Sequence, residues 1–274
     1  MAALWKSLIC ILLLAACAVM GEGAHAGTAC QSHQVGSTEL RKASNAALRV
    51  LAQLEAKDRP YAIISRVGQD LSKFGLRYSH AGLVVRDHPA GRWTVIHQLN
   101  YCGSAESGIY EEGLLNFFLD DLLEYDAHLL WPDDQLSAQL VDALADSAVL
   151  RVFDRRYNVI SRYGSSRTQN STAWLLELVG LAMAAEQPSC QSRSLRPREQ
   201  ARCALDRHGF RADMIRIGYG KRLLGGMFSA NAQFTDHPVG SRLSGRYEVV
   251  TVRSILGFAS TMAVEQMVIR EPAP

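Results

Sequence analysis

Apolar side chains recur at three- and four-residue intervals in several parts of the chain, which is the spacing of one helix face. The first such stretch begins near Ser37 and predicts an amphipathic helix with Leu40, Ala43, Ala47, Leu48, Leu51 and Leu54 on one side. Similar patterns predict helices over residues 114–119, 135–148, 171–186 and 253–262, and a short helix within 187–206. Asn170 or Ser171 would cap the helix over 171–186.

Two β-rich runs interrupt this helical pattern and predict a hairpin. Ser79–Val85 and Trp93–Leu99 flank the turn-forming residues 86–92. Other strand-like runs cover residues 61–67, 149–153, 212–217 and 247–252. Without an internal repeat or a low-complexity linker, the pattern predicts one α+β domain over residues 27–274. Its core would span about 36–186, and its C-terminal extension 187–274.

The first 26 residues have the pattern of a secretory signal peptide. Lys6 precedes an apolar stretch, and Ala24-His25-Ala26 fits a signal-peptidase site. Leu14-Ala15-Ala16-Cys17 also fits a lipobox, so a lipoprotein anchored at Cys17 is the alternative. Both predict an exported protein, either periplasmic or secreted, or membrane-anchored through lipid. No later apolar run is long enough to predict a transmembrane span.

Composition and cysteine content narrow the function classes. The 274 residues are 48% hydrophobic with a formal net charge of only +2, and no basic run favours nucleic acid as a partner. An even number of cysteines after position 26 in an oxidising compartment predicts two disulfides. Three pairings are possible, and the short segment between Cys190 and Cys203 favours Cys190–Cys203 with Cys30–Cys102. A thiol nucleophile would require one of these four to stay unpaired.

Metal and cofactor motifs are missing from the sequence. It contains no His-Glu-x-x-His, no Gly-x-Ser-x-Gly and no phosphate-binding glycine loop. The eight histidines include no pair at metal-ligand spacing. We therefore expect neither a metal nor a cofactor.

The predicted hairpin carries two histidines. With a turn centred near Pro89, His80 lies directly opposite His97, and both side chains point to one face of the sheet. One neutral imidazole can then act as a general base while the other orients it. The alternative is that one histidine caps a strand and the other is solvated.

A candidate nucleophile lies at a predicted helix N-terminus. Ser171 follows Asn170 where free backbone N–H groups stabilise an anion, as an oxyanion hole requires. The alternative is a plain helix cap. Asp70 would position substrate or bind Arg77, unless it is a surface carboxylate, and Tyr163 would line a groove or pack in the core.

These pieces together resemble the circularly permuted papain-like superfamily, which includes NlpC-type peptidases and lecithin:retinol acyltransferase-like proteins. The resemblance rests on Ser79–Val85, Val95-Ile96-His97 and Asn170-Ser171, in that order. It implies an antiparallel sheet packed against helices, with His80 as base, His97 as orienting residue and Ser171 in the position of the nucleophilic cysteine.

The implied function is a hydrolase or acyltransferase acting on amide or ester bonds of the cell envelope, on a small molecule, peptide or lipid. Candidate substrate-binding residues are Asn170, Tyr78, Asp70 and Tyr163. A serine is a poorer nucleophile than a thiolate. The alternative is therefore an inactive papain-like fold that binds a cell-wall or lipid ligand.

Four stretches also resemble a secreted bacterial family known only as domain of unknown function 2145. They are Arg66–Ser72, Arg77–Gly82, Gln169–Ser171 and Phe234–Pro238. This resemblance implies no activity.

Overall fold

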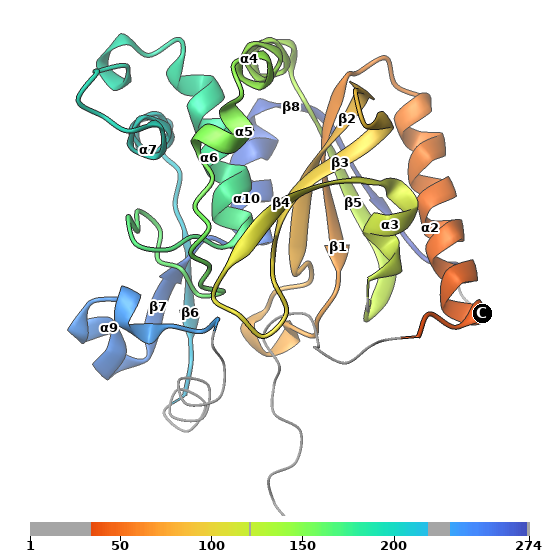
Figure 1. Ribbon diagram of the computed structural model, residues 1–274, viewed down its shortest axis with the longest axis horizontal. Coiled ribbons are helices and arrows are strands. Elements are labelled where there is room, and N and C mark those ends of the chain that lie inside the picture. The colour runs from red at the N-terminus through yellow and green to blue at the C-terminus, as the bar shows by residue number, and fades with distance from the viewer. Residues whose placement is uncertain (1–33, 121, 219–230, 273–274) are drawn as a thin grey trace, which may run out of the picture.

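A six-stranded antiparallel sheet stands between two groups of helices (Figure 1). The structure is a computed structural model that describes residues 34–120, 122–218 and 231–272. The strand order is β4-β3-β2-β1-β5-β8. The strands are β1 (Tyr61–Val67), β2 (His80–His88), β3 (Gly91–Asn100), β4 (Ser107–Gly113), β5 (Glu124–Pro132) and β8 (Ala263–Ile269). The α+β class is therefore confirmed. The predicted signal segment, Cys17 and Cys30 lie outside the described residues.

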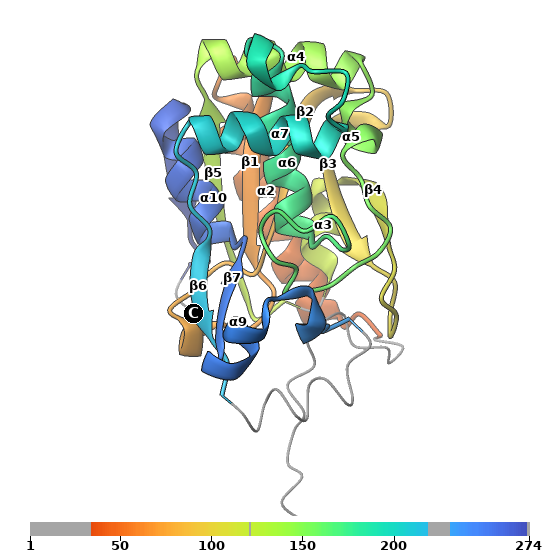
Figure 2. The same cartoon turned by 90° about the vertical axis from the view of Figure 1, so that its left-hand side faces the viewer.

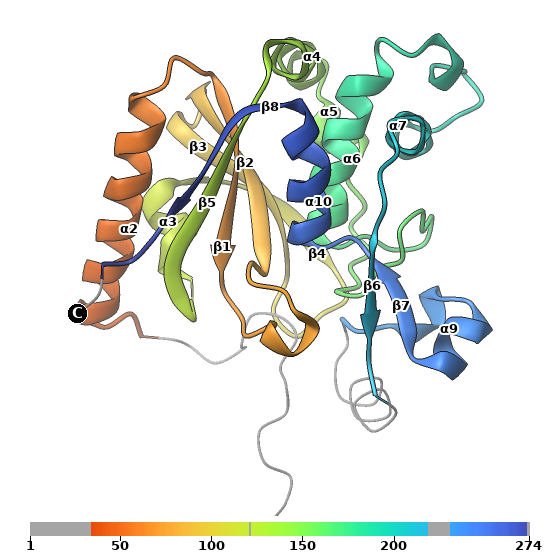
Figure 3. The same cartoon turned by 180° about the vertical axis from the view of Figure 1, so that it is seen from behind.

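Each face of the sheet is covered by its own helices (Figures 1 and 3). One face carries α2 (Ser37–Glu55) and α3 (Leu114–Leu119), and the other carries α6 (Ser171–Ala184) and α10 (Val252–Ala259). Strand β2 shows how the alternation works: Ala81 and Leu83 belong to the core beneath α6, whereas Val84 belongs to the core beneath α2 and α3. Side chains of successive residues thus lie in different layers.

The remaining elements surround the α6 side. These are α4 (Asp134–Ala145), α5 (Ala148–Arg151), α7 (Pro197–Arg207), α9 (Val239–Ser244) and the two-stranded sheet of β6 (Asp213–Arg216) and β7 (Arg246–Val249). Helix α7 lies across α6 (Figure 2). All fourteen residues of α6 are buried, as expected for a helix enclosed by other elements. Among the described residues no helix combines the length and apolarity that a membrane span requires.

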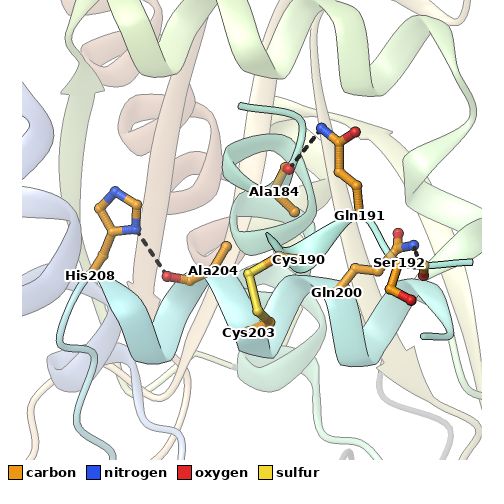
Figure 4. The surroundings of a disulfide bond; sticks show 8 residues. All are labelled: Ala184, Cys190, Gln191, Ser192, Gln200, Cys203, Ala204 and His208. Carbon is orange, nitrogen blue, oxygen red and sulfur yellow. Dashed lines mark hydrogen bonds between the residues drawn. A yellow bond between two sulfur atoms is a disulfide. The ribbon is translucent and has the colours of Figure 1, made fainter. Parts of the chain in front are cut away.

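A disulfide and a buried carboxylate fasten α7 to α6. Cys203 on α7 is bonded to Cys190, which precedes that helix, so this predicted pairing is confirmed (Figure 4). Glu177 on α6 accepts hydrogen bonds from Arg198 at 2.6 Å and from Arg202 at 3.0 Å. The Cys30–Cys102 pairing stays a prediction because Cys30 lies outside the described residues.

Some predicted elements differ from those observed. The run over 149–153, expected as a strand, belongs largely to α5 and the residues that end it, and β4, β5 and β8 were not predicted. Residues 187–274, expected as an extension, return to supply β8 beside β5 and α10 over the central sheet. Figure 3 shows this return from behind.

Candidate active site

The hairpin of β2 and β3 brings the two predicted imidazoles into contact. His80 Nε2 lies 2.8 Å from His97 Nδ1, and both side chains are buried. The rings meet edge to face beside Phe117 of α3. Phe117 belongs to the core beneath α2 and α3, so the pair lies on that face of the sheet.

The register that produces this contact differs from the predicted one. Leu83 pairs with Ile96, and the hairpin closes between His88 and Gly91. The turn therefore consists of Pro89 and Ala90. A register that places His80 directly opposite His97 would require a turn centred one residue earlier in the sequence. Continuing the observed register places Gly82 opposite His97, so the imidazoles are diagonal neighbours. They still share a face because the offset is two residues.

Gly82 leaves the space that His97 occupies. A Cβ atom at position 82 would lie 2.9 Å from the Ile96 carbonyl oxygen and 3.1 Å from His97 Cβ. Both distances are shorter than ordinary van der Waals contact. Any larger residue would therefore push the two strands apart where the imidazoles meet.

Glu112 of β4 extends the imidazole pair into a chain of three side chains. Its Oε2 lies 3.4 Å from His97 Nε2, a longer and weaker contact than that between the rings. An ionised carboxylate only accepts, so the proton of His97 belongs on Nε2. Its Nδ1 then accepts from His80 Nε2–H, and His80 Nδ1 keeps a lone pair.

Burial sets the charge of this chain. Removal from water lowers the pKa of His80 well below its usual 6.5 and also lowers the pKa of His97, so both rings are neutral at pH 7. The neighbouring His97 imidazole lowers the pKa of Glu112, and the charge of Arg66 acts in the same direction. Glu112 is therefore the charged member.

Arg66 of β1 adds a buried charge beside the imidazoles. It donates through Nη1 to the Phe117 carbonyl oxygen and through Nη2 to Asp120, and its side chain is only 3% exposed. Its guanidinium carbon lies 4.7 Å from the centre of the Phe117 ring. Both terminal nitrogens of the guanidinium are thus used within the protein.

This polar cluster borders a cleft of about 410 Å³, which we call the Arg66 cleft. Its lining comes from β1, β3, β4, α3 and the loop after β3. The lining includes Arg66, Tyr101, Tyr110, Glu112, Asn116 and Asp120. A cleft of similar volume at the ends of α4, α5 and α6 contains none of the members of the imidazole chain.

The structure does not bring Ser171 to this cluster. Ser171 begins α6, whose side chains pack with Ala81, Leu83 and Ile96 on the opposite face of the sheet. Its hydrogen bond is with Tyr157, whose pKa burial raises. The sheet thus separates the candidate nucleophile from the imidazoles.

The predicted substrate-binding residues have local structural partners instead. Asn170 caps α6: its Oδ1 accepts from the Ala173 backbone N–H at 2.7 Å. Tyr163 donates to Asp206 at 2.7 Å. Neither residue lines the Arg66 cleft.

The other two candidates lie around the segment before β2. Asp70 accepts from the Ser72 backbone N–H at 2.9 Å, whereas Arg77 donates to Glu124 and Asp126, so Asp70 does not bind Arg77. The Tyr78 ring packs against the ring of His128, with centres 5.7 Å apart. These contacts also lie outside the Arg66 cleft.

Sequence reasoning missed Arg66, Glu112 and Asp120. Arg66 had a recognisable signal, since it is the one charged residue in the mostly apolar run Tyr61–Val67 and buried charges require partners. Glu112 had none, because the polar and apolar residues of β4 do not alternate clearly. Asp120 lies just after the short helix α3, where a carboxylate is usually solvated.

Comparison with known proteins gives a family but no activity. The family model described as "Uncharacterized protein conserved in bacteria (DUF2145)" matches residues 53–259. That range contains His80, His97, Glu112, Arg66 and Ser171. No curated protein matches the chain, and no solved structure matches it. The papain-like resemblance therefore stays a prediction.

Proposed function

The chain belongs to the DUF2145 family of uncharacterised bacterial proteins, and from its geometry we propose that it is an exported protein that binds a small cell-envelope ligand in the Arg66 cleft. The observation that carries the proposal is the chain His80–His97–Glu112, which is buried at one end and borders the cleft at the other. Ionisable groups with shifted pKa values beside a cleft are typical of functional sites.

The energetic cost of this cluster supports a role in binding. Burying two imidazoles and a guanidinium in an apolar layer costs free energy that Leu or Phe side chains would not. Packing alone therefore does not explain why these polar side chains are buried there. The predicted signal segment and the Cys190–Cys203 disulfide favour an exported location.

A hydrolase or acyltransferase with a Ser171/His80/His97 site is the second proposal. The contact between the imidazoles favours it, because it suits a general base with an orienting partner. Proton transfer from Ser171 to His80 would require hydrogen-bond reach or one bridging water. Their position on opposite faces of the sheet favours binding over this chemistry.

A thermal-shift titration with a soluble muropeptide mixture tests the binding proposal. We expect the mixture to raise the Tm of the wild-type protein and of Ser171→Ala, and to leave the Tm of Asn116→Trp unchanged. Asn116 is exposed at the cleft, so a tryptophan there would fill the cleft without disturbing the core. No shift for the wild type, or an equal shift for Asn116→Trp, would count against the proposal.

A fluorophosphonate probe separates the two proposals. It labels serines that an adjacent base activates. Binding without hydrolysis predicts no mass increase at Ser171. Labelling at Ser171 that disappears in His80→Ala would instead establish the hydrolase.

A further inference from the structure

The charges and rings around the Arg66 cleft indicate what kind of group its ligand presents. Two carboxylates, Glu112 and Asp120, line the cleft together with the guanidinium of Arg66. Arg66 is nearly inaccessible and is paired with Asp120. The second carboxylate, Glu112, contacts a neutral imidazole, so the cleft has an excess negative charge at Glu112.

Among the described residues that line the cleft, an anionic ligand finds no accessible cationic side chain. The terminal nitrogens of Arg66 donate to Phe117 and Asp120, and its side chain is 3% exposed. The side chains of Glu112 and Asp120 are 27% and 32% exposed, so carboxylate oxygens are the charged atoms that a ligand can reach. A cation is therefore favoured over a phosphate or a carboxylate.

The cation that fits is an organic one. Tyr110 and Glu112 are two residues apart on β4, so both side chains point to the same side of the strand. Tyr101 also lines the cleft, and aromatic faces attract ammonium groups. Within the part of the chain that the structure describes, no group of three metal-ligating side chains comes together, which disfavours a metal ion.

We propose that the Arg66 cleft recognises a primary ammonium group on its ligand, held between the Glu112 carboxylate and the ring of Tyr110. This inference rests on the proposed binding function and names the chemistry that the cleft selects. The side-chain amine of a basic or diamino acid in an envelope peptide has this chemistry. The amide oxygen of Asn116 can accept a hydrogen bond from the same peptide.

An NMR titration with two lysine derivatives tests the inference. One probe is Nα-acetyl-lysine amide, which has a free side-chain amine, and the other is its Nε-acetylated analogue, which has the same shape but no charge. We expect the free amine to shift the resonances of β4 and α3 with an affinity at least about tenfold higher than that of the analogue. The difference should shrink with added salt, because the cleft is open to solvent.

Two glutamate variants provide the matched comparison. In Glu112→Gln the amide oxygen can still accept from His97, so we expect a folded protein that binds both probes equally weakly. Glu111 is the control. It lies opposite Ile96 of β3, its side chain points to the opposite face of the sheet from Glu112, and that side chain is 49% exposed. Glu111→Gln should keep the preference for the free amine.

The outcomes separate this inference from the proposed function. Equal binding of both probes, or an unchanged preference in Glu112→Gln, overturns the ammonium inference. So does the failure of both probes to bind. In each of these cases a muropeptide shift that Asn116→Trp abolishes would still support the cleft as the binding site.

Discussion

Glu112 favours one tautomer in each imidazole, although it contacts only one of them. Its carboxylate lies 3.4 Å from His97 Nε2 and favours a proton there, and His97 Nδ1 then accepts from His80 Nε2–H. The lone pair left on His80 Nδ1 is therefore a consequence of a residue two strands away. The position of the proton on each imidazole thus follows from the order in which the three side chains contact one another.

Stability should fall in mild acid because the imidazole pair is neutral when folded. The pKa values of His80 and His97 are lowered from 6.5, so below that pH the unfolded chain binds protons that the folded chain does not. The free energy of unfolding should then decrease by up to about 1.4 kcal/mol per pH unit for each imidazole that stays neutral. Urea unfolding at pH 7.5, 6 and 5 measures this slope.

The control for this slope is His97→Asn, which removes one of the two groups. It should show a smaller loss between pH 7.5 and 5 than the wild type. Some slope should remain, because burial also lowers the pKa values of His128 and His237. If the free energy of unfolding of His97→Asn fell as steeply with pH as that of the wild type, His97 would not be a source of the pH dependence.

Gly82→Ala should be costly despite its small size. The added methyl group meets a backbone oxygen at 2.9 Å and His97 Cβ at 3.1 Å, and neither atom is the flexible end of a side chain. We expect a loss of about 1–3 kcal/mol in unfolding free energy, measured by urea denaturation. Gly113→Ala is the control, since a Cβ there meets nothing within 4 Å. Equal stability of the two variants would refute the steric argument.

At the scale of elements, the sequence best predicted the helices and strands that are encoded by the spacing of neighbouring residues. Helix α2 and the β2–β3 hairpin lie where apolar spacing and turn residues indicated. Strands β5 and β8 were missed for different reasons. Strand β5 is buried along almost its whole length and so does not alternate, whereas β8 is an edge strand whose partner lies far back in the sequence.

The candidate site was likewise predictable only where its contacts are local in the sequence. The contact of His80 with His97 depends on one hairpin and was predictable from it. The positions of Arg66 and Glu112 depend on how β1 and β4 flank the β2–β3 hairpin in the sheet, which local spacing does not encode. The same limitation applies to Ser171, because the face of the sheet that a helix covers is decided by tertiary packing.

The contact between α6 and α7 should depend strongly on Glu177. This carboxylate is buried and accepts from Arg198, Arg202 and Gln169. Glu177→Gln leaves Arg202 without its carboxylate partner and Arg198 with Asp154 alone, so we expect a loss of about 3 kcal/mol in unfolding free energy. Chemical denaturation of Glu177→Gln beside Glu199→Gln, a half-exposed carboxylate at the start of α7 that pairs with Arg196, measures the difference. A loss below about 1 kcal/mol would mean that apolar packing and the disulfide, not the carboxylate, hold the helices together.

At the scale of the whole molecule, the sheet is completed by a strand from the other end of the chain. Strand β8 pairs with β5 from Ala127 to Pro132 and covers what would otherwise be an open edge. A chain that ends at Met262 should therefore expose the backbone groups of β5 and self-associate. Size-exclusion chromatography and light scattering should show aggregates for this truncation, and a stable monomer would contradict the expectation. A chain that ends at Glu271 is the control, because it retains β8.

The pairing of β8 with β5 also has a kinetic consequence. More than a hundred residues separate the two strands in the sequence, so the contact closes a very large loop. The native sheet cannot be completed until residue 269 is available, however early α2 and the first hairpin form. With the export that we propose, a chain whose sheet is completed only by its last residues would remain compatible with translocation machinery that accepts only unfolded polypeptide.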